Sequence, residues 1–184
     1  MAKATQPATV YQLKITLRDV RPPVWRRVEV KDCSLGTLHQ VIQTCMGWTD
    51  SHLHSFEVGR QRFGEPDSEL DQRDENRIKL SRVVEGGYNK FSYVYDFGDN
   101  WEHTIQVEKA LPAAAGVRYP RCVAGKRACP PEDCGGPWGY PDFLEAVQDP
   151  GHPEHEELLE WAGGEFDPEQ FDLDAVNAQL AAVR

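Results

Sequence analysis

Two alternating runs of aromatic and aliphatic residues, joined by a short polar turn, constrain the fold of this chain more than any other feature. The apolar positions are Phe91, Tyr93, Tyr95 and Phe97 in the first run, and Trp101, His103, Ile105 and Val107 in the second. Alternation with a period of two predicts half-buried strands. Pairing the two apolar faces selects a three-residue Gly98–Asn100 loop, because a one-residue slip would turn a polar face toward an apolar one. The sequence therefore predicts a hairpin in which Tyr95 lies opposite His103.

Other segments supply the remaining elements. Alternation predicts strands at 11–17, 24–30 and 52–58. Leu38, Val41, Ile42, Cys45 and Met46 follow helical spacing, and Ser34 or Thr37 can cap this amphipathic helix, which Gly47 ends. Helices are also expected at 141–147, at 153–161 and from Asp172 onward.

These elements predict a single α+β domain, with a mainly antiparallel sheet packed on the amphipathic helix. We expect a flexible tail at residues 1–9 and one domain at 10–184. Within it, residues 110–141 form a long Cys/Pro/Gly loop, and residues 141–184 form a helical tail. A chain of 184 residues is long enough for one such core.

Charge is spread unevenly along the chain. The net charge is −10, and residues 128–184 carry one Lys/Arg but fourteen Asp/Glu. No apolar run approaches the roughly 20 residues that span a bilayer, so no membrane association is expected. The N-terminus lacks the apolar core of a signal peptide, which favours a cytoplasmic location. Free thiols or a metal are then expected in place of structural disulfides.

The Cys-rich loop contains Cys122, Cys129 and Cys134 within thirteen residues. Its C-x6-C-x4-C spacing differs from the paired C-x2-C of zinc ribbons, and three thiolates need a fourth ligand to close a tetrahedral zinc site. His103 is the first candidate, and His152, His155 or Asp133 are alternatives. A bound zinc, a disulfide and three unliganded thiols all remain open.

Two further sets of residues are candidate sites. His52 and His54 share one strand face, and Asp96 and Asp99 flank the hairpin turn, so these four side chains form a possible second metal site. The alternative for His54 is a hydrogen-bonded core histidine. The arginines Arg18, Arg21, Arg26 and Arg27 could contact a phosphate backbone, or they could form an ordinary charged surface.

Several segments together resemble one family. They are RPPVWRRVEV, TLHQVIQTCMGWTDSHLHSFEV, YVYDFGDNWEHTIQVE, CVAGKRACPPEDCGGPWGY and DPEQFDLDAVNAQL. These segments resemble the plasmid pRiA4b ORF-3-like family, which includes proteins labelled as passengers of a transposable element. The resemblance implies a single α+β domain. It also implies a common site, without implying a reaction, made of His52, His54, Asp96, Asp99, Trp101, His103, Cys122, Cys129 and Cys134.

The sequence contains no P-loop, GxGxxG, GxSxG or HExxH motif. This favours a non-enzymatic cytoplasmic binding or accessory module, in which the Cys-rich loop clamps the tail helices to the hairpin and could hold a structural zinc. A protein partner is favoured over nucleic acid. The alternatives are a metal-dependent enzyme of the hydrolase or nuclease type, and a DNA-associated accessory protein of a mobile element.

Overall fold

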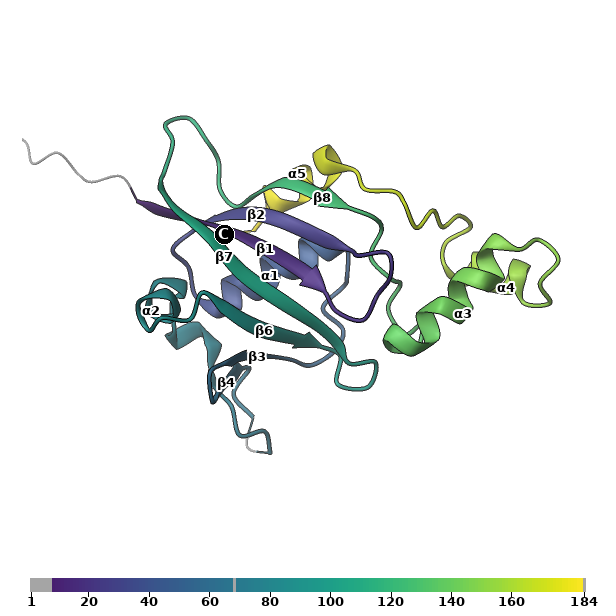
Figure 1. Ribbon diagram of the computed structural model, residues 1–184, viewed down its shortest axis with the longest axis horizontal. Coiled ribbons are helices and arrows are strands. Elements are labelled where there is room, and N and C mark those ends of the chain that lie inside the picture. Colours follow the sequence, from purple (N-terminus) through teal and green to yellow (C-terminus); the bar gives the residue numbers. More distant parts are fainter. Residues whose placement is uncertain (1–7, 68, 184) are drawn as a thin grey trace, which may run out of the picture.

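The computed structural model describes residues 8–67 and 69–183, which form one sheet with the long helix α1 on one face (Figure 1). The strand order is β5-β4-β3-β6-β7-β1-β2-β8, and every neighbouring pair is antiparallel except the parallel pair β4 and β5. The strands are β1 (Thr9–Leu17), β2 (Trp25–Lys31), β3 (His54–Val58), β4 (Gln61–Gly64), β5 (Arg73–Asp74), β6 (Lys90–Tyr95), β7 (Trp101–Pro112) and β8 (Arg121–Lys126). The predicted α+β class with a mainly antiparallel sheet is confirmed.

The helices are α1 (Leu35–Met46), α2 (Leu80–Glu85), α3 (Gly136–Gln148), α4 (His155–Trp161) and α5 (Leu173–Leu180), with a 3-10 turn η1 (Glu75–Arg77). Helix α1 begins where the sequence predicts. The Ser34 side chain accepts a hydrogen bond from the backbone N–H of Thr37, and Gly47 ends the helix in the left-handed region. Its apolar face is fully buried, which makes α1 the central element of the core.

The hairpin of β6 and β7 has the predicted faces but not the predicted register. Tyr95 pairs with Trp101, and Tyr93 pairs with His103, so the loop has five residues instead of three. Asp96 and Asn100 both adopt positive φ, and the Asn100 N–H donates to the Asp96 carbonyl. This turn closes by local hydrogen bonds that apolar pairing does not reveal. Phe97 consequently lies outside the apolar face and is largely exposed.

Two segments that the sequence indicated as irregular contain regular structure. Within residues 110–141, β7 extends to Pro112, β8 pairs with β2, and α3 already begins at Gly136. The polar and charged segment 60–77, which has few apolar residues, contains β4, β5 and η1, and it buries the side chains of Phe63 and Glu75. Both β8 and β4 lack clear apolar alternation, so their pairing depends on a neighbouring strand edge.

The tail helices lie in two places. Helix α5 packs against α1 and β8, whereas α3 and α4 pack on each other beyond the end of the sheet (Figure 1). Of the expected tail at residues 1–9, residues 1–7 lie outside the described part, and Thr9 already belongs to β1. Among the described residues, no helix combines the length and the apolar character needed to cross a membrane.

Candidate functional site

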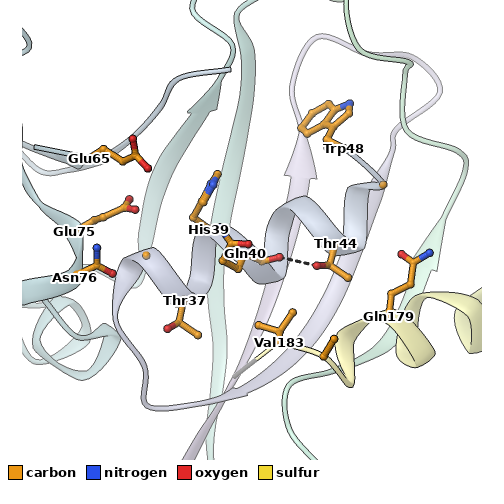
Figure 2. A pocket seen from close by; sticks show the side chains of 13 residues that line it. Thr37, His39, Gln40, Thr44, Trp48, Glu65, Glu75, Asn76, Gln179 and Val183 are labelled. Atoms are coloured by element: carbon orange, nitrogen blue, oxygen red, sulfur yellow. Dashed lines mark hydrogen bonds between the residues drawn. The ribbon is translucent and has the colours of Figure 1, made fainter. Parts of the chain in front are cut away.

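A pocket of about 800 Å³ lies over the outer side of α1 (Figure 2). Helix α1 contributes His39 and Gln40 to its wall, the end of β4 contributes Glu65, and η1 contributes Glu75. A second cavity of about 260 Å³ also uses Glu65, and His54 lies on its wall. The two hollows share Glu65; His39 of α1 lines the larger one, and His54 of β3 lines the smaller one.

His39 and His54 are stacked against each other between these hollows. Their ring centroids are 3.5 Å apart and their planes differ by 5°. His39 Nε2 lies 2.8 Å from Asp50 Oδ1, and His54 Nε2 lies 2.8 Å from Glu75 Oε2. Each imidazole is thus paired with its own carboxylate, and three of these four side chains are buried.

A directed set of hydrogen bonds fixes the protonation of His39. The Asp50 N–H donates to Gln43 Oε1, so the Gln43 amide nitrogen faces the Tyr93 hydroxyl and donates to it over 3.0 Å. The Tyr93 hydroxyl then donates its proton to His39 Nδ1, 2.8 Å away. His39 is left to donate from Nε2 to Asp50. Burial, followed by the His54 ring, lowers the pKa of His39 and favours this neutral form.

Glu75 is a buried carboxylate that a close backbone approach brings to the pocket. Gly36 lies in the first turn of α1, and a Cβ at this position would meet the Asn76 and Glu75 side chains. Glycine therefore lets η1 approach α1 and places Glu75 beside His54.

The cluster has the chemistry of a metal-ligand set. His39, Asp50 and His54 each offer one ligand atom within 4.8 Å of the others, and the Glu75 carboxylate lies 2.8 Å from His54 Nε2. Imidazole and carboxylate together suit zinc, manganese, iron, cobalt or nickel. None of the described residues that line the two cavities is a lysine or arginine, so the surroundings are electronegative.

The structure divides the predicted set of His52, His54, Asp96 and Asp99 between different contacts. His54 belongs to the stack, whereas His52 Nε2 lies 3.0 Å from Asp133 and 3.6 Å from Asp96. Asp99 instead accepts a hydrogen bond from the Gly135 N–H over 3.2 Å. The four side chains do not share one centre, because the five-residue turn carries Asp99 beyond the end of the sheet.

The predicted zinc set of Cys122, Cys129, Cys134 and His103 is not assembled either. His103 is on β7 and Cys122 is on β8, three strand spacings away, or about 14 Å at the usual separation of neighbouring strands. The Cys122 thiol instead donates to the Ala124 carbonyl over 3.3 Å. Within the described part of the chain, no set of three close ligand groups includes a cysteine.

All five cysteines are free thiols. Burial raises the pKa of the Cys134 thiol to about 12 and raises that of Cys129 further, so neither is held as a thiolate. Of the alternative fourth ligands, His155 contacts the Ala146 carbonyl, and His152 accepts a hydrogen bond from the Glu154 N–H.

The loop contacts the hairpin end through its polar residues. The Tyr95 hydroxyl donates to Glu132, Thr49 Oγ1 lies 2.5 Å from the same carboxylate, and Trp48 Nε1 donates to the Pro130 carbonyl. Gly136 lies so close to the Asp99 backbone that a Cβ would collide with it. These contacts fix residues 130–136 against the β6–β7 turn.

The four arginines proposed as a phosphate-binding surface have different environments. Arg18 pairs with Glu102 and Arg27 pairs with Glu108, while Arg21 is exposed. Arg26 is buried, and its guanidinium donates to three backbone carbonyls. The expected basic surface is therefore not formed by these four residues, because three of them are used within the fold.

His103 occupies the interior of the sheet without a charged partner. Its ring is fully buried and packs edge-on against Trp48, Nδ1 lies 3.3 Å from the Tyr93 carbonyl, and Nε2 has no partner among the described residues. Burial lowers the pKa of His103 to about 4. This histidine is a core residue that belongs to neither of the close ligand groups found among the described residues.

We expect His103 to make the fold sensitive to mild acid. Between pH 6.5 and pH 4, His103 is protonated in the unfolded chain but neutral in the folded protein. Neutral, buried His103 therefore makes its full contribution to the free energy of unfolding only above pH 6.5. That contribution is lost as the pH falls toward 4, by about 3 kcal/mol in all. Urea unfolding of wild type and His103→Phe across this range tests the expectation, with His152→Gln as the control. Equal slopes of stability against pH for wild type and His103→Phe would contradict it.

Sequence reasoning missed His39, Asp50, Glu65 and Glu75. His39 is one turn before Ile42 on α1, so helical spacing alone places it beside the apolar stripe and predicts that it is partly buried. Asp50 follows the glycine that ends the helix, and Glu65 and Glu75 belong to a polar segment without periodicity. Nothing in their local sequence indicates that they converge.

Comparisons with known proteins give consistent matches. The model of the family described as "Plasmid pRiA4b ORF-3-like protein" matches residues 9–175. "Uncharacterized protein y4hQ" of Sinorhizobium fredii (strain NBRC 101917 / NGR234) is 48% identical over 160 residues, which cover 85% of this chain and 82% of that protein. The crystal structure of MM3350 from Methanosarcina mazei Go1, titled a protein of unknown function, is 41% identical with a TM-score of 0.84. That match covers 91% of this chain and 97% of MM3350.

Proposed function

The chain belongs to the plasmid pRiA4b ORF-3-like family, and from its histidine–carboxylate pocket we propose that it is a metal-dependent enzyme of the hydrolase type. The observation that carries the proposal is the stacked His39–His54 pair, which has a carboxylate on each ring. His39 lines the pocket over α1, and His54 lines the smaller cavity beside it. In this proposal His39, Asp50 and His54 hold one divalent ion.

Burial favours a metal as the partner of this cluster. Buried polar side chains are normally retained when they are fully paired or when they coordinate an ion. His39 and His54 lie next to two carboxylates, so a divalent cation would offset the negative charge that the pocket concentrates. Glu75 would then orient His54 from behind, as carboxylates commonly do for metal-bound histidines.

Ion binding requires a small rearrangement. Parallel imidazoles direct their lone pairs into parallel planes, so one ring must turn before both nitrogens can face the same ion. The ion would also replace the proton that His39 shares with Asp50. Zinc uptake should therefore release protons and separate the stacked rings.

Two histidines and one carboxylate leave coordination positions free, which is the pattern of catalytic zinc sites. An ion held there would supply an activated water for the hydrolysis of an ester or amide near neutral pH. Glu65 lies in both cavities and is available as a general base. Because no lysine or arginine is among the described lining residues, a neutral or cationic substrate fits the pocket better than a phosphate.

The proposal is tested by metal binding followed by turnover. Purified protein stripped with a chelator is titrated with zinc and with manganese in a calorimeter. We expect one ion per chain, with proton release that shows as a binding heat that changes with the ionisation enthalpy of the buffer. The loaded protein should then hydrolyse p-nitrophenyl acetate faster than the stripped protein, and should favour it over bis-p-nitrophenyl phosphate. Absence of stoichiometric binding for every divalent metal tried would overturn the metal site. If the protein binds the metal but hydrolyses no neutral ester or amide, the metal site stands and the proposed hydrolase activity is rejected.

A further inference from the structure

A separate hollow lies between α3 and α4, outside the two cavities at the proposed metal site. Its volume is about 360 Å³. Phe143, Leu158 and Trp161 form its apolar part, and the Phe143 and Trp161 rings meet edge to face with centroids 5.8 Å apart. The groove therefore presents two aromatic surfaces at a steep angle to each other.

Helix α4 is incompletely packed where it borders this groove. None of its residues is buried, although it carries Leu158, Leu159 and Trp161. Trp161 is 48% exposed, and Trp138 of α3 is 86% exposed. Trp138 is one helical turn before Asp142, which lines the groove, so both residues lie on the same side of α3. Exposed large aromatic side chains on neighbouring helices mark an interaction surface.

Negative charge surrounds the apolar part of the groove. Its wall contains the carboxylates of Asp133, Asp142, Glu154 and Glu157. None of these four carboxylates is paired with a lysine or arginine in the described structure, and residues 128–183 contain no lysine or arginine at all. Such a surface repels anions and attracts a cationic partner.

We propose that this groove docks a lysine- or arginine-rich segment of a partner protein, with an apolar side chain of that segment inserted between α3 and α4. The carboxylates of the rim attract the basic side chains, and the aromatic walls accept both the apolar anchor and a cation over a ring face. This site is independent of the metal pocket, because the two share no lining residue. Its test does not depend on any metal.

The test uses the full chain and a defined probe. The peptide KKLLKKLLKKLL is titrated into the protein at moderate salt, and binding is followed by the fluorescence of the exposed tryptophans. We expect saturable binding that weakens with salt. The double variant Glu154→Gln/Glu157→Gln should weaken it by about tenfold, and Trp161→Ala by at least about tenfold. The matched control is Glu156→Gln/Glu160→Gln, which removes the same charge from α4 at positions that do not line the groove. It should change binding by less than about threefold.

Each other outcome counts against the proposal. Equal weakening by the two double variants would show nonspecific attraction to the acidic tail. Equal affinity for KKSSKKSSKKSS would exclude an apolar anchor. Dimers in sedimentation that Trp161→Ala dissociates would assign the groove to a second copy of the chain. Circular dichroism of each variant establishes that α3 and α4 remain folded, and the charge variants carry the test if Trp161→Ala does not fold.

Discussion

Zinc affinity is expected to fall by about 100-fold or more when His54 is replaced by glutamine, and to stay within about threefold when His52 is replaced in the same way. The two histidines are separated by one residue in the chain, yet they belong to different clusters. His54 is stacked on His39 and paired with Glu75, whereas His52 faces Asp96 and Asp133. The same substitution at both positions therefore distinguishes the two possible metal sites by calorimetric titration.

Thermal unfolding provides an independent readout for the same variants. A ligand that binds only the folded state at 100 times its Kd stabilises the protein by about 2.7 kcal/mol. Zinc should raise the Tm of wild type and of His52→Gln, and should leave that of His54→Gln nearly unchanged. If His52→Gln loses the shift and His54→Gln keeps it, the ion belongs to the Asp96–Asp133 cluster.

A third variant separates loss of a ligand from loss of fold. Asp50 has φ of 58° and a side chain that is 41% exposed, and asparagine tolerates the same backbone conformation. Asp50→Asn should therefore fold normally while zinc binding weakens by about tenfold or more. Unchanged zinc affinity in Asp50→Asn would remove this carboxylate from the ligand set.

The elements that could be predicted from sequence are those whose signals are local. Helix α1 has a complete apolar face between Ser34 and Gly47, and β1 has strict alternation from Tyr11 to Leu17, so each shows its buried side. The start of β1 at Thr9, two residues before the predicted start, is not marked by this alternation. The apolar faces of the hairpin followed from the same argument. Its register did not, because Asp96 closes the turn with its side chain on the Gly98 N–H, 2.9 Å away.

The candidate site could not be predicted because its residues come from separate segments. His39 comes from α1, His54 from β3 and Glu75 from a 3-10 turn, and each looks ordinary in its own segment. Only tertiary packing stacks the two rings and brings Glu75 beside α1. The spacing of the cysteines in the Cys-rich loop suggested one ligand set, but among the described residues no group of three close ligand atoms includes a cysteine.

Arg26→Met is expected to destabilise the fold by about 3 kcal/mol or more. Arg26 shares one face of the predicted strand 24–30 with Val24 and Val28, and all three side chains are buried. Its Nε donates to the Cys45 carbonyl over 2.8 Å, and Nη1 donates to the carbonyls of Trp25 and Lys126. Methionine fills much of the volume but leaves these acceptors without a donor.

The cost is large because Arg26 joins several elements at once. The Cys45 carbonyl is one of the four at the C-terminal end of α1 that have no partner within the helix, and a cation there also complements the helix dipole. The guanidinium lies 4.2 Å from the centre of the Phe171 ring, which ties the tail to the sheet. No carboxylate among the described residues pairs with Arg26, so its stabilising contacts are these carbonyls and this ring.

Urea unfolding of three variants tests this account. Arg21→Met removes an equal charge from an exposed position of the same region, and should change the free energy of unfolding by no more than about 0.5 kcal/mol. Arg26→Lys should fall between the two, because a single ammonium keeps the charge but cannot reach all three carbonyls in the planar arrangement of a guanidinium. If Arg26→Met is as stable as Arg21→Met, the carbonyls must find other donors, and the guanidinium does not hold α1, β8 and the tail together.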